Sequence, residues 1–274
     1  MALPLCDDGA VPSPAPPQWD LQADCSQCTG LCCVALPYTR SADFPATKTA
    51  DTACPHLDDS CGCRIHDRLT ADGWHGCRAF HCAGAGPHTA QVLFPQRSWR
   101  TDDEPAVQFD TFRMMLGMFE IARYVEEARA RVAPGAPCAD PDLAAALAQV
   151  SADLHHEVHR APPVDRDDAL QYRARAAPLL HQVAAAVRDA HACRAALSPL
   201  ARRLTRQAPG ADLAGRNLRG ADLRGSDLTG ALLIGTDLRG ADLAEATLLG
   251  VDPRGALLDG TKLDSALFAP PGWG

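Results

Sequence analysis

Residues 211–268 read ADLAG RNLRG ADLRG SDLTG ALLIG TDLRG ADLAE ATLLG VDPRG ALLDG TKLDS ALF when they are written in fives. Leucine dominates the third position of each five, and a small residue usually holds the first position. A period of five fits neither an α-helix nor a simple strand. The pattern predicts a solenoid in which each pentapeptide forms one side and turns a corner. First and third positions then point inward, and the mostly polar second position faces water.

This stretch resembles the pentapeptide-repeat family. The resemblance implies a right-handed quadrilateral β-helix with four repeats per coil, so that eleven full repeats and a partial one make about three coils, roughly 15 Å tall. Two positions depart from the family pattern. Arg216 stands where a small residue belongs, and Pro253 replaces an inward leucine and removes a backbone donor. We expect Phe268 and the tail 269–274 to cap the open end of the solenoid.

The repeat region carries charges of both signs, nine acidic and six basic residues. Some members of the resembled family mimic DNA in shape and charge and bind topoisomerases. Three coils of mixed charge favour a docking scaffold for a protein partner instead, and no residue among them suggests catalysis. A homodimer formed by stacking the repeats of two chains stays open.

A second unusual feature lies near the N-terminus, where nine of the twelve cysteines fall between residues 25 and 82. The chain begins without a basic, apolar signal-peptide pattern, which predicts a cytoplasmic protein. Thiols stay reduced in the cytosol, so clustered cysteines there indicate metal binding more often than disulfides. We therefore expect a metal-binding domain.

The spacing within this block bears on the kind of metal. Cysteine thiolates select zinc, copper(I) and iron–sulfur clusters over hard cations. Adjacent Cys32 and Cys33 are difficult to aim at one ion, because neighbouring side chains diverge in extended backbone. They are more naturally shared between two sites, or between a cluster and something else. Eight thiols can form two four-cysteine zinc sites, one or two iron–sulfur clusters, or one cluster with spare reactive thiols.

The cysteine spacing also resembles the YkgJ-like family of zinc- or iron-chelating proteins. The residues that carry the resemblance are C-x2-C-x3-C-C from Cys25, CPHL from Cys54, CRIH from Cys63 and CRAFHC from Cys77. The resemblance implies eight metal ligands: Cys25, Cys28, Cys32, Cys33, Cys54, Cys63, Cys77 and Cys82.

Three further residues are candidates for additional ligands. Cys61 exceeds the family pattern, His66 stands where the family has an aromatic residue, and His81 neighbours Cys82. Flagellin lysine methylases share a similar CxxCxxxCC segment in an iron–sulfur context. We therefore expect an iron–sulfur cluster or iron as the cofactor, with zinc as the alternative.

The middle of the chain is predicted to be helical. One helix starts near residue 110 with Asp110 or Thr111 as its cap, and a second has Asp140 as N-cap and Pro141 as first residue. A third helical region covers 167–206, punctuated by prolines. The predicted core stripes are Phe112, Met115, Leu116, Phe119, Ala122 and Val125, then Leu143, Leu147, Val150, Leu154 and Val158.

Several isolated residues are assigned no metal-binding role. His155 and His159 lie four residues apart on one helix, and we interpret them as part of a solvated face. Methionines 114, 115 and 118 are expected to fill the core. The cysteines outside the block are Cys6, Cys138 and Cys193.

The expected fold class is multidomain: a loop-rich cysteine domain, a helical connector and a quadrilateral β-helix. The predicted parts are a disordered proline-rich leader 1–20, a metal-binding domain 21–95, a connector 96–208, the repeats 209–268 and the tail 269–274. The net charge of −8 argues against nucleic-acid binding, and no stretch approaches the ~20 apolar residues of a membrane span.

These features predict a cytoplasmic metal-binding protein with a redox or maturation role and a docking scaffold. One alternative is a metal-dependent enzyme that modifies a peptide, a protein or a small metabolite. The other is an interaction module with structural zinc. The sequence holds no phosphate-binding loop, nucleophile elbow or HExxH motif, so catalysis stays open and would depend on the metal.

Overall fold

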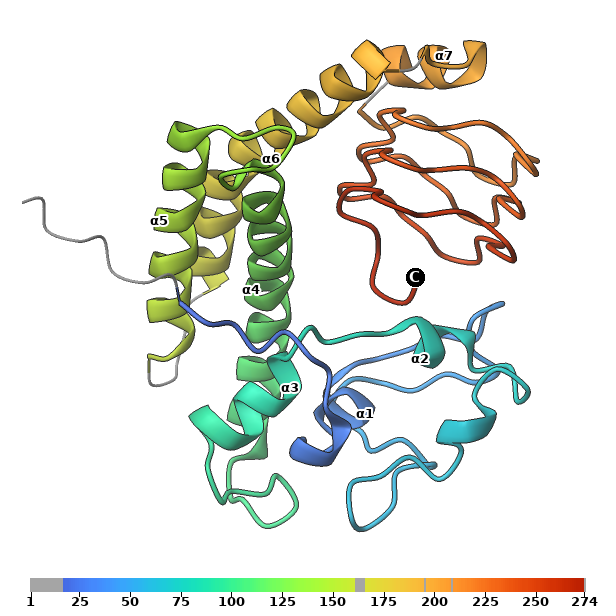
Figure 1. The fold of residues 1–274 in the computed structure, drawn as a ribbon. Helices are drawn as coiled ribbons and strands as arrows, with labels where there is room; N and C mark the ends of the chain where they lie inside the picture. Colours follow the sequence, from blue (N-terminus) through green and yellow to red (C-terminus); the bar gives the residue numbers. More distant parts are fainter. Residues whose placement is uncertain (1–16, 161–165, 195, 208, 274) are drawn as a thin grey trace, which may run out of the picture.

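The computed structural model describes residues 17–160, 166–194, 196–207 and 209–273. Three parts are visible in Figure 1: the cysteine block, a bundle of three long helices, and a solenoid at the C-terminal end. Of the leader 1–20 that the sequence predicted to be disordered, residues 1–16 lie outside the described part of the chain. Its end is ordered instead, because Trp19 donates a hydrogen bond from its indole to Ser151 Oγ at 3.0 Å.

The central bundle consists of α4 (Pro105–Val132), α5 (Pro141–Val158) and α6 (Arg166–Arg194). Each helix contacts the other two. The predicted apolar stripes of α4 and α5 are buried between them, except for Leu116, which is only half-buried. The 3.6-residue periodicity therefore identified the core face of both helices.

The first of these helices begins earlier than predicted. Proline stands at its first position, Pro105, where a missing N–H costs no intrahelical hydrogen bond. Asp110 is not a cap; it lies inside the helix and pairs with Arg113 at 2.7 Å. The predicted cap of α5 is confirmed, because the Asp140 carboxylate accepts the Leu143 N–H at 3.0 Å.

The third helical region is divided at its second proline. Helix α6 continues through Pro178, and α7 (Pro199–Gln207) starts at the next proline. Leu204 of α7 is buried in the core of the solenoid, and Thr205 Oγ1 accepts the Asp227 N–H at 3.0 Å. Helix α7 therefore covers the start of the solenoid (Figure 1).

The repeats form coils of 20 residues. Parallel bridges join residues 20 positions apart, as Asp212 pairs with Leu232 and Leu232 with Asp252. The described bridges in this region form four series, one on each side of the coil. Each series joins three residues in successive coils, so the repeats make about three coils. They are isolated bridges rather than continuous strands, because each side of the coil is one pentapeptide long.

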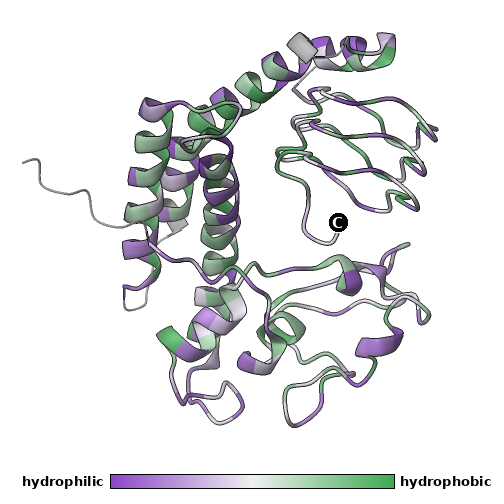
Figure 2. Ribbon diagram, in the orientation of Figure 1, coloured by the Kyte–Doolittle hydropathy of each residue, from purple (hydrophilic) through white to green (hydrophobic). Residues whose placement is uncertain are grey.

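The pentapeptide positions behave as the sequence predicts. The third-position leucines of the middle coil are fully buried, and apolar and polar residues alternate along the coils (Figure 2). The fifth residue turns the corner with a positive φ, for example 64° at Gly215 and 62° at Gly235. Side chains disfavour this backbone conformation, which explains the glycine at the end of most repeats.

The two irregular repeat positions lie at the two ends of the solenoid. Arg216 is in the first coil and exposed. In the middle coil a third-position N–H bonds to the next coil, as Leu233 N does to Asp252 O at 2.9 Å. Pro253 lies in the last coil, which no further coil follows, so its missing donor removes no coil-to-coil bond.

The end of the solenoid is anchored in the helical bundle. Phe268 is fully buried in the same core as the bundle, and its ring centroid lies 5.6 Å from that of Tyr124. Its N–H donates to Glu127 Oε1 at 2.8 Å. Phe268 therefore closes the solenoid, as predicted, and does so by entering the bundle.

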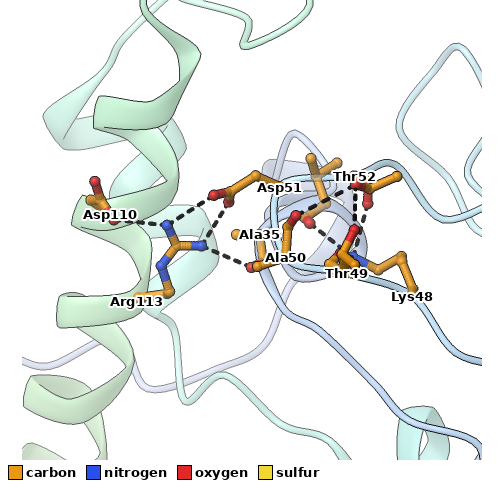
Figure 3. A network of polar contacts seen from close by, with 9 residues as sticks. Ala35, Lys48, Thr49, Ala50, Asp51, Thr52, Asp110 and Arg113 are labelled. Atoms are coloured by element: carbon orange, nitrogen blue, oxygen red, sulfur yellow. Dashed lines mark hydrogen bonds and ion pairs between the residues drawn. The ribbon is translucent and has the colours of Figure 1, made fainter.

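The cysteine block is built from loops and short helices: α1 (Leu31–Ala35), α2 (His75–Ala79), α3 (Ala85–His88), the turns η1 (Cys25–Gln27) and η2 (His66–Arg68), and η3 (Thr89–Leu93). Helix α1 packs on α4. Arg113 of α4 fixes this contact by binding Asp51 at 2.7 Å and the Ala35 carbonyl at 2.8 Å (Figure 3). None of the described helices is long and apolar enough to cross a membrane.

Candidate metal centre

The predicted ligand cysteines gather around α1, which carries Cys32 and Cys33. Cys28 directly follows η1, whose cap N–H bonds back to Cys25 O. The loop with Cys54 is held against the helix, because Cys54 N donates to Cys33 O at 2.9 Å. Residues far apart in sequence therefore meet at one short helix.

The first group of thiols lies between η1, α1 and α3. A methyl group built on Gly86 of α3 would stand 3.0 Å from Cys28 Sγ and 3.6 Å from Cys82 Sγ. Both sulfurs thus face the bare backbone of this glycine. The pKa of Cys28 is raised by burial and then by Cys82 and Cys25, which places Cys25 near this pair. The pKa of Cys32 is raised first by its hydrogen bond to Cys33 and by burial, and then by the charges of Cys33, Cys28 and Cys25. Cys32 therefore lies near both Cys33 and this first group.

The second group consists of Cys33, Cys54, Cys63 and Cys77. Burial raises the pKa of Cys77 to about 12, and the nearby Cys33, Cys54 and Cys63 add to the rise. The Tyr38 hydroxyl lies 3.6 Å from Cys54 Sγ and is placed to donate to it. Four thiols from two loops, α1 and α2 therefore share this second neighbourhood.

The adjacent pair on α1 lies where the two groups meet. Cys32 Sγ and Cys33 Sγ lie 3.9 Å apart, within hydrogen-bonding distance of each other. The sequence predicted a pair shared between two sites, or between a cluster and something else, because side chains diverge in extended backbone. The backbone is helical instead, and successive side chains on a helix point about 100° apart.

The electrostatics around the pair are uneven. Cys32 donates to Cys33, and this hydrogen bond raises the pKa of Cys32 and lowers that of Cys33. The Lys48 ammonium lowers the pKa of Cys33 further. Most of the other thiols have raised pKa values because they are buried. Metal binding would displace these protons, since the thiolate is the ligand.

Lys48 is a residue that the sequence analysis missed. Its ammonium is buried and donates to Val34 O at 2.9 Å, Thr49 O at 3.2 Å and Thr52 O at 2.8 Å (Figure 3). All three protons are used, and Val34 O belongs to α1. Lys48 thus fixes the helix that bears the cysteine pair. No motif marks it, because its partners are backbone carbonyls.

Replacing Lys48 by Met is expected to destabilise the protein by about 3 kcal/mol, because three carbonyl groups lose a buried charged donor. Chemical denaturation of the purified protein would measure the change. Lys262→Met is the control, since that ammonium is exposed and lies 3.7 Å from Asp242. Exposed pairs contribute less than about 1 kcal/mol. Equal losses for both variants would contradict the role of Lys48.

The three additional ligand candidates lie in different settings. Cys61 is close to α1, with its Cβ 3.5 Å from a methyl group built on Gly30. The His66 side chain is 70% exposed and pairs with Asp67. His81, next to Cys82, accepts the Ala83 N–H at its Nδ1, at 3.0 Å, so only its Nε2 could bind a metal.

The solvated face predicted for the histidines of α5 is confirmed in part: His156 and His159 are exposed, whereas His155 is half-buried. The His155 ring packs edge-on against Trp19, with centroids 5.2 Å apart, and lies tilted against His159 at 4.3 Å. His88 joins this cluster at 4.8 Å from His159. Trp19 comes from the N-terminal segment, whose docking site on α5 a helix periodicity does not reveal.

Outside these groups, the isolated Cys138 has its Sγ 3.7 Å from Ala186 O, at the junction with α6. Cys6 and the side chain of Cys193 fall outside the described residues. Across the part of the chain that the structure describes, no group of three or more His, Cys, Asp or Glu side chains is placed to coordinate a metal ion.

Comparison with known proteins identifies the repeats. The model of the family "Pentapeptide repeats" matches residues 210–243 and 236–268, with eight copies. An uncharacterized protein of Bacillus subtilis (strain 168), YybG, is 44% identical over 111 residues. The match covers 40% of this chain and 40% of that protein, so the chain spans less than half the length of its relative. The C-terminal region is thus a pentapeptide-repeat region, joined to a cysteine-rich N-terminal part.

Proposed function

We propose that this chain is a metal-binding protein that holds iron–sulfur clusters or iron at eight cysteines and serves a redox or maturation role. The observation that carries the proposal is the gathering of these thiols around α1 in two groups of four. The resemblance of the cysteine block to the YkgJ-like family belongs to the same proposal. Cysteine sets of four are the usual ligands of such clusters.

The donor set is made of cysteine sulfurs, which are the ligands of iron–sulfur clusters, and a cluster inserts its own iron and sulfide between the thiolates. The space over Gly86, which any side chain would narrow, lies between Cys28 and Cys82. When bound, such a cluster supplies one-electron chemistry at a potential that burial and hydrogen bonds to sulfur adjust.

The protein around the thiols shields and orients them. Leu31 and Val34 are buried behind the pair on α1. Tyr38 and Lys48 place a hydroxyl and a positive charge near the second group, which favours thiolates there. The described cysteines are all free, so a reducing, cytoplasmic setting is part of the proposal.

The test is metal analysis with a visible absorption spectrum on full-length protein purified without oxygen. Iron with inorganic sulfide and a broad band near ~400 nm would support the proposal. Colourless protein with about two zinc ions per chain would overturn the iron assignment in favour of structural zinc. Protein without any bound metal after reconstitution would overturn both.

A metal-dependent enzyme is the second candidate, and one observation favours it. A cleft of about 910 Å³ lies beside Cys82 and His81, between the cysteine block and the solenoid. A cavity of this size next to a metal centre is where a substrate would bind.

For the solenoid, we propose the right-handed quadrilateral β-helix of its family and a docking role for a protein partner. Leu232 and Leu257 are exposed apolar residues on it, at 40% and 46%. DNA mimicry has little support, because Asp222, Asp237 and Asp252 are each paired with an arginine two residues later. Paired carboxylates cannot present the unbroken negative charge of a phosphate backbone.

A further inference from the structure

The cleft beside the cysteine block is enclosed by three parts of the molecule. Its walls are α2, the face of α4 that includes Leu116 and Tyr124, the last coil at 250–258, and the tail 270–273. Figure 1 shows the C-terminal tail between the solenoid and α2. Gly272 lies against this helix, where an added methyl group would stand 3.0 Å from Ala79 O. The tail therefore closes one side of the cleft.

Arg123 is the charged residue of α4 that lines this cleft without a hydrogen-bonded counter-ion. Its Nε and Nη2 are shielded from solvent and have no hydrogen-bond partner among the described residues. The nearest paired carboxylate oxygen is Glu127 Oε2, 3.7 Å from Nη1. Glu127 already uses Oε1 to accept the Phe268 N–H, which holds it toward the solenoid. The guanidinium carbon lies 4.4 Å from the Tyr124 ring centroid.

A second arginine on the same helix has a close carboxylate partner, which Arg123 lacks. Arg129 is equally exposed, at 19%, but binds Glu126 at 2.6 Å. Two other charges along the cleft are paired: Glu120 binds Arg173 at 3.0 Å, and Arg254 binds Asp252 at 2.6 Å. Burying guanidinium N–H groups without hydrogen-bond partners costs free energy. Such a group in a native protein calls for an explanation, and a ligand that accepts its hydrogen bonds is one.

We propose that Arg123 binds the oxyanion of an organic ligand, a carboxylate or phosphate ester, whose apolar body fills the cleft. The planar guanidinium presents paired N–H groups that match both anions. Phe80, which is 40% exposed, Leu258 and Trp273 supply apolar surface for the rest of the ligand. A cavity of about 910 Å³ suits a small organic molecule.

This site is distinct from the cysteine groups, although it adjoins Cys82. It depends on Arg123 and the cleft, and not on which metal the thiols bind. If metal analysis finds no bound metal, the anion-binding proposal for Arg123 is unaffected. If anion binding is absent, the metal-binding proposal is unaffected.

The test is calorimetric titration of the metal-loaded full-length protein with phenyl phosphate, benzoate and inorganic phosphate. We expect saturable binding of at least one aromatic anion, weakened at least tenfold by Arg123→Met. Arg123→Lys should be intermediate, because it keeps the charge and loses the paired donors. Arg129→Met, at a site of equal exposure, should bind as the wild type does.

The probes also identify the anion. Tighter binding of phenyl phosphate assigns a phosphate ester, and tighter binding of benzoate assigns a carboxylate. Inorganic phosphate binding as tightly as phenyl phosphate would overturn the part of the proposal that gives the apolar walls a role. The proposal fails if no probe saturates, if Arg123→Met binds normally, or if Arg129→Met loses binding equally.

Folding controls accompany these variants. Arg123→Met should unfold at the same temperature as the wild type or higher, since it removes a charge that lacks hydrogen-bonded partners. A clear fall in its unfolding temperature without ligand would overturn the assignment, because Arg123 would then be stabilising the fold itself.

Discussion

Cys33→Ser is expected to remove about half of the metal that the protein binds, and Cys32→Ser to remove the other half. The reason is that Cys32 lies near Cys28 and Cys25, whereas Cys33 lies near Cys77, so we assign the two sulfurs to different groups of four thiols. Loss of one thiolate of four opens a site to solvent and competing ligands, whereas the second site keeps its ligands. Metal and sulfide content per chain, measured after anaerobic purification, would show the two halves.

Double variants test the division directly. Adding Cys28→Ser to Cys32→Ser should cause little further loss, because both thiols belong to the first group. Adding Cys28→Ser to Cys33→Ser should remove nearly all metal, because each group then lacks a ligand. Non-additive effects within a site and additive effects between sites are the mark of independent units. A single substitution that empties the protein would contradict the two-group arrangement.

Matched controls exclude general damage to the block. Cys138→Ser, outside both groups, should leave metal content unchanged. Gly86→Ala should reduce only the first site, because its methyl group would lie 3.0 Å from Cys28 Sγ. Gly117→Ala is the comparison, since an added methyl group there meets nothing within 4 Å. Equal metal loss in both glycine variants would argue against the cradle over Gly86.

Phe268→Ala is expected to destabilise the protein by about 3–5 kcal/mol, the usual cost of emptying a fully buried phenylalanine site. The residue joins the end of the solenoid to the bundle through Tyr124 and Glu127. Its φ of 58° is unfavourable for a bulky residue, so the chain retains this conformation because packing on both sides requires it. Alanine at this position would keep the unfavourable φ and lose the packing contacts of the ring.

Denaturation with two probes would measure this effect. Helical circular dichroism follows the bundle, and Trp273 fluorescence follows the tail once the three other tryptophans are replaced by phenylalanine. Phe80→Ala serves as the control, because that ring is 40% exposed and should cost less than about 1 kcal/mol. A loss below about 1 kcal/mol for Phe268→Ala would show that the solenoid does not rely on this anchor.

The sequence by itself determined the repeat solenoid and the core faces of the long helices. Both are periodic, so each residue has the same kind of surroundings as the residue one helical turn or one coil away. That is why Leu233 and Leu238 could be placed inside a coil, and Leu147 and Leu154 inside a bundle, from spacing alone. The candidate ligands were also recognisable, because thiol spacing is a strong local signal.

Only the tertiary structure decided how those parts are used. The meeting of the cysteine groups at α1, the burial of Lys48 and the unpaired donors of Arg123 all depend on partners distant in sequence, many of them backbone groups that carry no sequence signature. The early start of α4 at Pro105 is a local choice that apolar periodicity does not register. Local patterns specify the elements, whereas packing between them decides which charges are paired and which thiols face each other.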